Sequence, residues 1–443
     1  MTTLENRFPL LAVEHGCIIS KDADITVAFE VELPELYTVT GAEYEAIHSC
    51  WCKAIKVLPD YSVVHKQDWF IKERYKPELQ KDDMSFLSRS FERHFNERPY
   101  LKHTCYLYLT KTTKERNRMQ SNFSTLCRGH IIPKELDRET TTKFLEACEQ
   151  FERIMNDSGL VRLRRLSTDE IVGTEGKTGL IERYFSLMPE GDTTLQDIEL
   201  SAREMRIGDN RLCLHTLSDA EDLPGKVATD TRYEKLSTDR SDCRLSFASP
   251  VGLLLSCNHI YNQYVLIDNS EETLQKFEKS ARNMQSLSRY SRSNSINREW
   301  IDQYLNEAHS YGLTSVRAHF NVMAWSDDAE ELKHIKNDVG SQLASMECVP
   351  RHNTGRNFAN EQVGFASFQR INARPFAPMP FAFSVSLSIS FLVRVFAACF
   401  ATIARTLPPA SMAERNTTKS RSETKSEIFC NSMPNRVSGL SEP

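Results

Sequence analysis

The chain has 443 residues, of which 40% are hydrophobic and 26% charged, and its formal net charge at pH 7 is −5. This length supplies apolar material for one large hydrophobic core or two medium ones. The slightly acidic balance excludes a global attraction for nucleic acid or anionic lipid, so a partner of either kind would need a local basic patch.

The cysteine pattern predicts reduced thiols in a cytoplasmic protein without structural disulfides. Twelve cysteines are scattered irregularly, and no apolar signal stretch follows Met1. Short-spaced Cys/His pairs occur at His48/Cys52, Cys127/His130, Cys213/His215 and Cys257/His259. None of them has a second pair at zinc-like spacing, and free cysteine is usually buried, so they predict core packing and no metal site.

The first third of the chain reads as strands interrupted by two helices. Alternation predicts an N-terminal β meander of Pro9 to Val13, Cys17 to Ser20 and Ile25 to Leu33. Helical spacing then begins at Gly41 and ends at Pro59. The elements predicted next are a strand from Ser62 to Arg74, a helix from Ser85 to Asn96 and a strand from Leu101 to Leu109.

The middle of the chain begins with a long predicted helix from Lys134 to Ser158, which carries one apolar stripe. Strands are predicted at Val161 to Ser167, Asp197 to Ile207 and Arg211 to Leu217, with a turn at Gly208 to Asn210.

The later part alternates strands with helices. The predicted order is a strand from Tyr264 to Asp268, helices from Glu271 to Ser286 and from Ser295 to Tyr311, a strand from Thr314 to Trp325 and a helix from Asp327 to Met346. Ser326 is expected to cap the last helix, and Val339 and Leu343 belong to its buried stripe. The alternation predicts an α/β fold, in which helices pack on a mixed sheet.

Three regions are expected along the chain: a strand-rich α+β region over 1–160, a second α/β region over 161–353, and a tail of different composition over 354–443. In the tail, no Asp or Glu occurs between Gln362 and Ala413, and seven of the 17 prolines follow Arg374. This composition predicts disordered or irregular structure. Phe381 to Ala404 has the length of a membrane span, but Arg394 and repeated serines disfavour insertion, so a disordered tail is favoured over a membrane span.

One glycine-rich stretch, Gly173 to Gly179, resembles a phosphate-binding loop. Its candidate ligand residues are Gly173, Gly176, Lys177 and Thr178. A phosphate-binding loop needs a glycine five positions before Gly176, where this chain has Ile171, so an ordinary turn before a short helix is the favoured interpretation.

A Ser-rich connector carries four arginines around Tyr290, a composition that could contact nucleic acid. They are Arg282, Arg289, Arg292 and Arg298. Neighbouring acidic residues dilute the patch, so a solvated loop is favoured and direct DNA binding is not expected. No catalytic nucleophile or metalloprotease motif accompanies these residues.

Six segments carry a family resemblance. They are Glu5–Leu11 (ENRFPLL), Leu163–Gly179 (LRRLSTDEIVGTEGKTG), Ser246–Leu253 (SFASPVGL), Asn258–Tyr264 (NHIYNQY), Val316–Trp325 (VRAHFNVMAW) and Cys348–His352 (CVPRH). Together they make residues 1–354 similar to the N-terminal region of the Bacteroidetes-type TraG conjugative-transposon ATPases, relatives of the large ATPases of type IV secretion.

The resemblance implies an α/β region that docks the ATPase to an inner-membrane channel, followed in the family by a RecA-like motor with Walker loops. This chain departs from the family pattern after Thr354, and no Walker residue can be assigned to it. We therefore expect a truncated docking and assembly region without ATPase activity, with ATP as a cofactor only of the full-length family. Its expected partners are other conjugation-apparatus proteins, with self-association as a further expectation, and its expected place is the cytoplasm, peripheral to the inner membrane.

Two alternatives remain open from the residues. A nucleotide phosphohydrolase would use the loop from Gly173 to Thr178. A membrane-anchored conjugation accessory protein would use Phe381 to Ala404.

Overall fold

The computed structural model describes residues 10–20, 24–35, 39–75, 85–112, 138–187, 196–200, 204–217, 222–224, 227–287, 290–352 and 387–388. Internal contacts divide the chain into a unit of Met1–Thr406 and a unit of Leu407–Pro443. The second unit, and nearly all of the tail that composition sets apart, lies outside the described residues.

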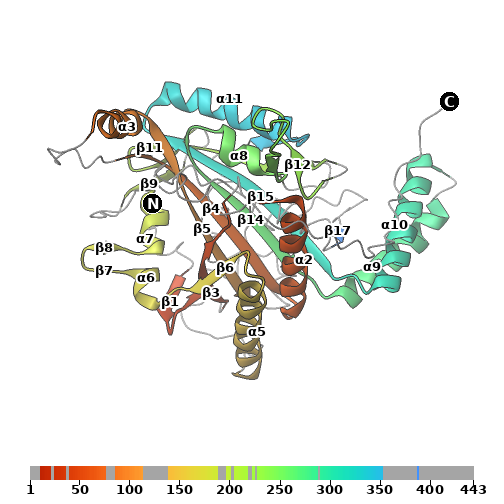
Figure 1. The fold of residues 1–443 in the computed structure, drawn as a ribbon. Helices are drawn as coiled ribbons and strands as arrows, with labels where there is room; N and C mark the ends of the chain where they lie inside the picture. The colour runs from red at the N-terminus through yellow and green to blue at the C-terminus, as the bar shows by residue number, and fades with distance from the viewer. Residues whose placement is uncertain are drawn as a thin grey trace, which may run out of the picture. The chain divides into compact units, whose positions relative to one another are not determined.

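One antiparallel sheet is the centre of the described fold (Figure 1). Its main path runs through β1 (Leu10–Glu14), β2 (Cys17–Ser20), β3 (Ile25–Glu32), β5 (Pro99–Lys111), β4 (Ser62–Arg74), β14 (Asn258–Ile267), β15 (Ser315–Ser326), β11 (Asn210–Leu217), β10 (Met205–Ile207) and β9 (Ile198–Leu200). Off this path, β6 (Arg162–Arg165) pairs with β3, β16 (Arg351–His352) with β11 and β17 (Leu387–Ser388) with β15. The mixed helix and sheet architecture expected from the sequence is confirmed.

The N-terminal meander is confirmed, because β1, β2 and β3 pair consecutively and antiparallel. His15 and Gly16, both with positive φ, form the turn between β1 and β2. The next hairpin pairs β4 with β5 along the full length of both strands, from Ser62↔Lys111 to Arg74↔Pro99. Its connection carries the helix α3 (Phe86–Asn96).

The boundary expected at residue 160 does not divide this sheet. Strand β4 from the first expected region pairs with β14 from the second, in a register that runs from Val63↔Leu266 to Phe70↔His259. The two regions therefore share one sheet. Hydrophobic periodicity locates strands along the chain but carries no information on which distant strand they pair with.

One face of the sheet is covered by α2 (Gly41–Val57), α5 (Arg138–Asp157), α8 (Ser249–Leu254) and α11 (Ala329–Ser345). Helix α2 begins with a capping box between Thr40 and Glu43. Trp51 on α2 meets Phe151 on α5 with ring centroids 5.7 Å apart. Burying such large apolar side chains contributes roughly 1.5 to 3 kcal/mol each and fixes the helices to the sheet.

The opposite face packs against the short helices α6 (Thr168–Val172) and α7 (Leu180–Ser186). Its apolar cluster includes Trp69, Trp325 and Tyr184. Between the apolar residues of this face runs a row of buried polar side chains. Asn262 accepts hydrogen bonds from Gln67 (2.9 Å) and lies 3.1 Å from His65, and it donates to Asn321 (2.9 Å).

Among the element boundaries that differ from the predictions, two change the description of the sheet. Strand β14 begins at Asn258, six residues before the predicted start, because Asn262 and Gln263 are buried although their polarity is typical of a loop. The predicted strand from Asp197 to Ile207 is the antiparallel pair of β9 and β10.

The predicted cap of the helix after β15 was also wrong by two residues. The N-cap of α11 is Asp328, whose side chain accepts from the backbone N–H of Glu330 at 3.0 Å. Ser326 instead accepts from the backbone N–H of Asp328 and donates to Glu331. Among the helices that the structure describes, none has both the length and the apolar character required to cross a bilayer.

Candidate functional site

The chain that connects the central strands β14 and β15 forms an arm, which is an antiparallel pair of helices (Figure 1). The arm consists of α9 (Ser270–Leu287) and α10 (Arg292–Tyr311). Asn269 accepts a hydrogen bond from the backbone N–H of Glu272 (2.9 Å) at the start of α9, and Gly312 ends α10 in the left-handed conformation with φ 58°. Local sequence signals therefore set both ends of the arm.

The arm has a small apolar core of its own and a polar attachment to the sheet. The core is formed by Phe277, Ala281, Met284, Ile301 and Leu305. At the attachment, the backbone N–H of Ser315 donates to the hydroxyl of Ser270 (3.0 Å).

Large apolar and aromatic side chains remain exposed on the arm. Tyr290 is 85% exposed, Trp300 55% and Tyr311 67%, and Ile296 is also exposed. Trp and Tyr are the residues most enriched at the centres of protein interfaces, because their rings bury a large area at little loss of conformational entropy. The arm is therefore a candidate protein-docking surface.

Three of the four arginines in the predicted cluster lie on this arm. Arg282 lies on α9 and pairs with Glu278 at 3.9 Å, whereas Arg298 lies on α10 and pairs with Asp302 at 3.4 Å. Arg292 opens α10 and is exposed, and Arg289 lies outside the described residues. Two of the three described arginines thus pair with carboxylates of their own helix, and these ion pairs lower the local positive potential. They do not show whether the arm contacts nucleic acid.

The glycine-rich stretch forms a small hairpin between α6 and α7. Gly173 and Thr174 (β7) pair with Thr178 and Lys177 (β8), and Gly176 occupies the turn with φ 81°. A Cβ added to Gly179 would lie 2.2 Å from the backbone carbon of Val172. The glycines thus allow two backbone segments to touch, whereas a phosphate loop needs successive backbone N–H groups free to bind the ligand.

The Cys/His pairs that the structure describes lie in the cores or at their margins. Cys213 and His259 both pair with Ala324 from opposite sides, and the Cys257 Sγ lies 3.9 Å from the His259 Nδ1. Burial raises the pKa of Cys213 and of Cys257 to about 12 and lowers the pKa of His259 to about 4. The thiols are therefore protonated and the imidazole neutral at pH 7.

On helix α2, the Cys52 Sγ lies 3.8 Å from the His48 Nε2. Cys127 and His130 lie outside the described residues. Within the part of the chain that the structure describes, no group of three or more His, Cys, Asp or Glu side chains is arranged to hold a metal ion.

The sequence did not predict a buried ionic group on the sheet face that α2, α5, α8 and α11 cover. Lys66 and Asp68 form an ion pair with fully buried side chains, and His103 lies 2.9 Å from the second oxygen of Asp68. Burial raises the pKa of the Asp68 carboxyl, but Lys66 and His103 outweigh it and hold that pKa below its ordinary value. The alternating charges in this strand would ordinarily predict a solvated face, so no sequence signal marks the group as buried.

Comparison with known proteins gives one family match. Residues 1–49 match the family model described as "Domain of unknown function, B. Theta Gene description (DUF3875)". In the structure this stretch includes β1, β2, β3 and the first half of α2. No curated protein matches the chain.

Proposed function

We propose that this chain is a docking and assembly region of a TraG-type conjugation ATPase, acting in the type IV secretion apparatus of a conjugative transposon without ATPase activity of its own. The resemblance of residues 1–354 to the region that precedes the motor in that family carries the proposal. The arm of α9 and α10 supports it, because an arm that is anchored to the sheet and exposes Trp300 and Tyr290 has the chemistry of a protein-docking surface.

The proposed partner of the arm is another protein of the conjugation apparatus at the inner membrane. The exposed side chains are aromatic and aliphatic, and the arginines beside them are partly neutralised by Glu278 and Asp302. This composition favours a protein surface over the phosphates of DNA, which would require an unneutralised basic patch.

Interference with conjugation tests the proposal. The chain is produced in a donor strain that carries a conjugative transposon with a complete TraG-type ATPase, and transfer frequency is measured. If the chain occupies docking positions, transfer should fall at least about tenfold, because the added chain competes with the complete ATPase. The double variant Ile296→Ser/Trp300→Ser should restore transfer at equal protein level.

The matched control is Val349→Ser, which removes an exposed apolar side chain outside the arm. It should interfere as strongly as the unchanged chain. Transfer that stays unaffected by the unchanged chain at high protein level would overturn the proposed function. Interference that the arm double variant retains would instead place the docking surface elsewhere.

A further inference from the structure

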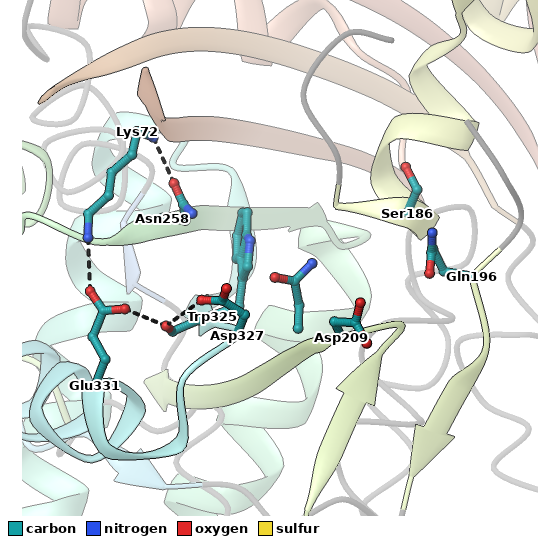
Figure 2. A pocket seen from close by; sticks show the side chains of 10 residues that line it. Lys72, Ser186, Gln196, Asp209, Asn258, Trp325, Asp327 and Glu331 are labelled. Carbon is teal, nitrogen blue, oxygen red and sulfur yellow. Dashed lines mark hydrogen bonds and ion pairs between the residues drawn. The ribbon is translucent and has the colours of Figure 1, made fainter. Parts of the chain in front are cut away.

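A polar pocket of about 390 Å³ lies where strand ends from both halves of the chain meet α11 (Figure 2). Its walls come from the end of β4, the start of β14, the end of β15, the turn before β11 and the first turn of α11. The lining residues are Lys72, Ser186, Gln196, Asp209, Asn210, Asn258, Trp325, Ser326, Asp327 and Glu331. The volume is that of a site for a small molecule or a single long side chain.

The charged groups of the pocket favour a cationic ligand. Three carboxylates line it, and the one ammonium group, that of Lys72, already pairs with Glu331 at 3.0 Å. Hydrogen bonding from Ser326, together with Lys72, holds the pKa of Glu331 below its usual range, so this carboxylate is charged at pH 7. Asp209 and Asp327 have no cationic partner among the residues that the structure describes.

The N-terminus of α11 does not make the pocket an anion-binding site, because two of its backbone N–H groups already have acceptors. The backbone N–H of Asp328 donates to Ser326 (3.2 Å), and that of Glu330 donates to the Asp328 side chain (3.0 Å). These groups would otherwise be the donors for a phosphate or carboxylate at a helix N-terminus. With those donors occupied and carboxylates on the wall, an anionic ligand would be repelled.

Trp325 adds a separate requirement on the ligand. Its side chain is only 2% exposed, yet it lines the pocket, and its indole stands between Asn258 and Asp209 in Figure 2. The indole N–H makes no hydrogen bond with the described part of the chain and is not among its buried unpartnered atoms, so this donor is open to the pocket. A ligand that fills the pocket should therefore offer an acceptor oxygen near the indole.

We infer that this pocket binds an organic cation of the arginine type, in which a guanidinium or ammonium group meets Asp209 and Asp327 while a nearby carbonyl oxygen accepts from Trp325. Carboxylates form paired, charge-assisted hydrogen bonds with guanidinium, and an indole face also attracts the cation. The pocket lies on the sheet and not on the arm, so this site is independent of the proposed docking surface.

The probe is N-acetyl-L-argininamide, which has one guanidinium and two amide carbonyls, titrated into the full chain by calorimetry at physiological salt. We expect saturable binding with a Kd below about 1 mM. N-acetyl-L-citrullinamide has nearly the same shape but no charge, and it should bind at least about tenfold more weakly. Equal binding of the two compounds would overturn the inference.

Variants assign the binding to this pocket. Asp209→Asn/Asp327→Asn should weaken binding of the charged probe at least about tenfold, and Trp325→Phe should weaken it while keeping an aromatic ring in place. Glu330→Gln is the matched control, because Glu330 belongs to the same helix turn but pairs with Lys333 and does not line the pocket. Unchanged thermal unfolding shows that each variant is folded. Binding that survives Asp209→Asn/Asp327→Asn would overturn the inference.

Two probes distinguish the source of the cation. Free L-arginine carries a carboxylate that the acidic wall repels, so stronger binding of the capped amide indicates an arginine side chain within a polypeptide. Stronger binding of free L-arginine indicates a small-molecule ligand of the same chemistry. Either result supports the site, and failure of both probes overturns it.

Discussion

At the scale of single residues, buried imidazoles link stability to pH. Burial lowers the pKa of His65 to about 3 and the pKa values of His215 and His259 to about 4. In the unfolded chain these groups titrate near 6.5. As pH falls below 6.5, the unfolded state therefore binds protons that the folded state does not bind, and the free energy of unfolding decreases.

His215 gives the cleanest test of this linkage. Between pH 6.5 and about 4 it should lower the free energy of unfolding by up to ~1.4 kcal/mol per pH unit. His215→Gln should flatten the pH dependence by that amount, as measured by urea unfolding at pH 7.5, 6.0 and 5.0. His94→Gln, at an exposed position on α3, should leave the slope unchanged. A His215→Gln slope that matches the unchanged chain would show that this imidazole is protonated in the folded state.

The glycine-rich hairpin gives a second prediction at this scale. The purified chain should neither bind nor hydrolyse ATP, because Thr174 and Lys177 are paired in a β ladder and Ile171 stands where a phosphate loop requires glycine. Calorimetry with Mg-ATP measures this. Saturable micromolar binding that disappears in Lys177→Ala would instead favour the nucleotide-binding alternative.

At the scale of elements, most helices and strands were predictable because their signals are local. The apolar stripe of α11 is an example, since Ile335, Val339 and Leu343 recur at helical spacing and are all buried. The start of β14 was missed for the opposite reason. Asn262 and Gln263 are polar yet buried, and only the pairing of distant strands brings Gln67 and Asn321 to hydrogen-bond with Asn262.

Helix α11 should tolerate charge only on its outer face. Val339 is fully buried in the core cluster, so Val339→Asp should destabilise the protein by several kcal/mol through an unpaired buried charge. Leu332 is only partly buried, and Leu332→Asp should have a smaller effect. Asn337→Asp on the exposed face of the same helix is the control. Equal thermal midpoints for Val339→Asp and Asn337→Asp would show that the helix is peripheral.

The pocket illustrates what local signals cannot provide. Lys72, Asp209 and Trp325 are far apart in the sequence and come from three different strands or turns. Each alone is typical of a strand end or a turn. Only the successive pairing of β4 with β14, of β14 with β15 and of β15 with β11 brings them to one place.

At the scale of the whole molecule, the described sheet depends almost entirely on residues before Asn353. Beyond that point the structure describes only β17, where Leu387 and Ser388 pair with Val316 and Ser315. Deleting Gly355–Pro443 should therefore preserve a single cooperative unfolding transition and improve solubility, because the deleted part includes a long apolar run. Thermal unfolding and sedimentation of both forms measure this. Loss of the cooperative transition would show that the tail belongs to the core.

The pairing of β4 with β14 also has a consequence for biosynthesis. Val63 leaves the ribosome long before its partner Leu266, and at ordinary elongation rates the interval is roughly 10 to 40 s. During that time one edge of β4 presents unpaired backbone groups, which is the usual starting point of intermolecular strand pairing. The nascent chain thus has a lengthy interval of aggregation risk, and its yield should depend on chaperones that bind exposed strands until translation has passed β14.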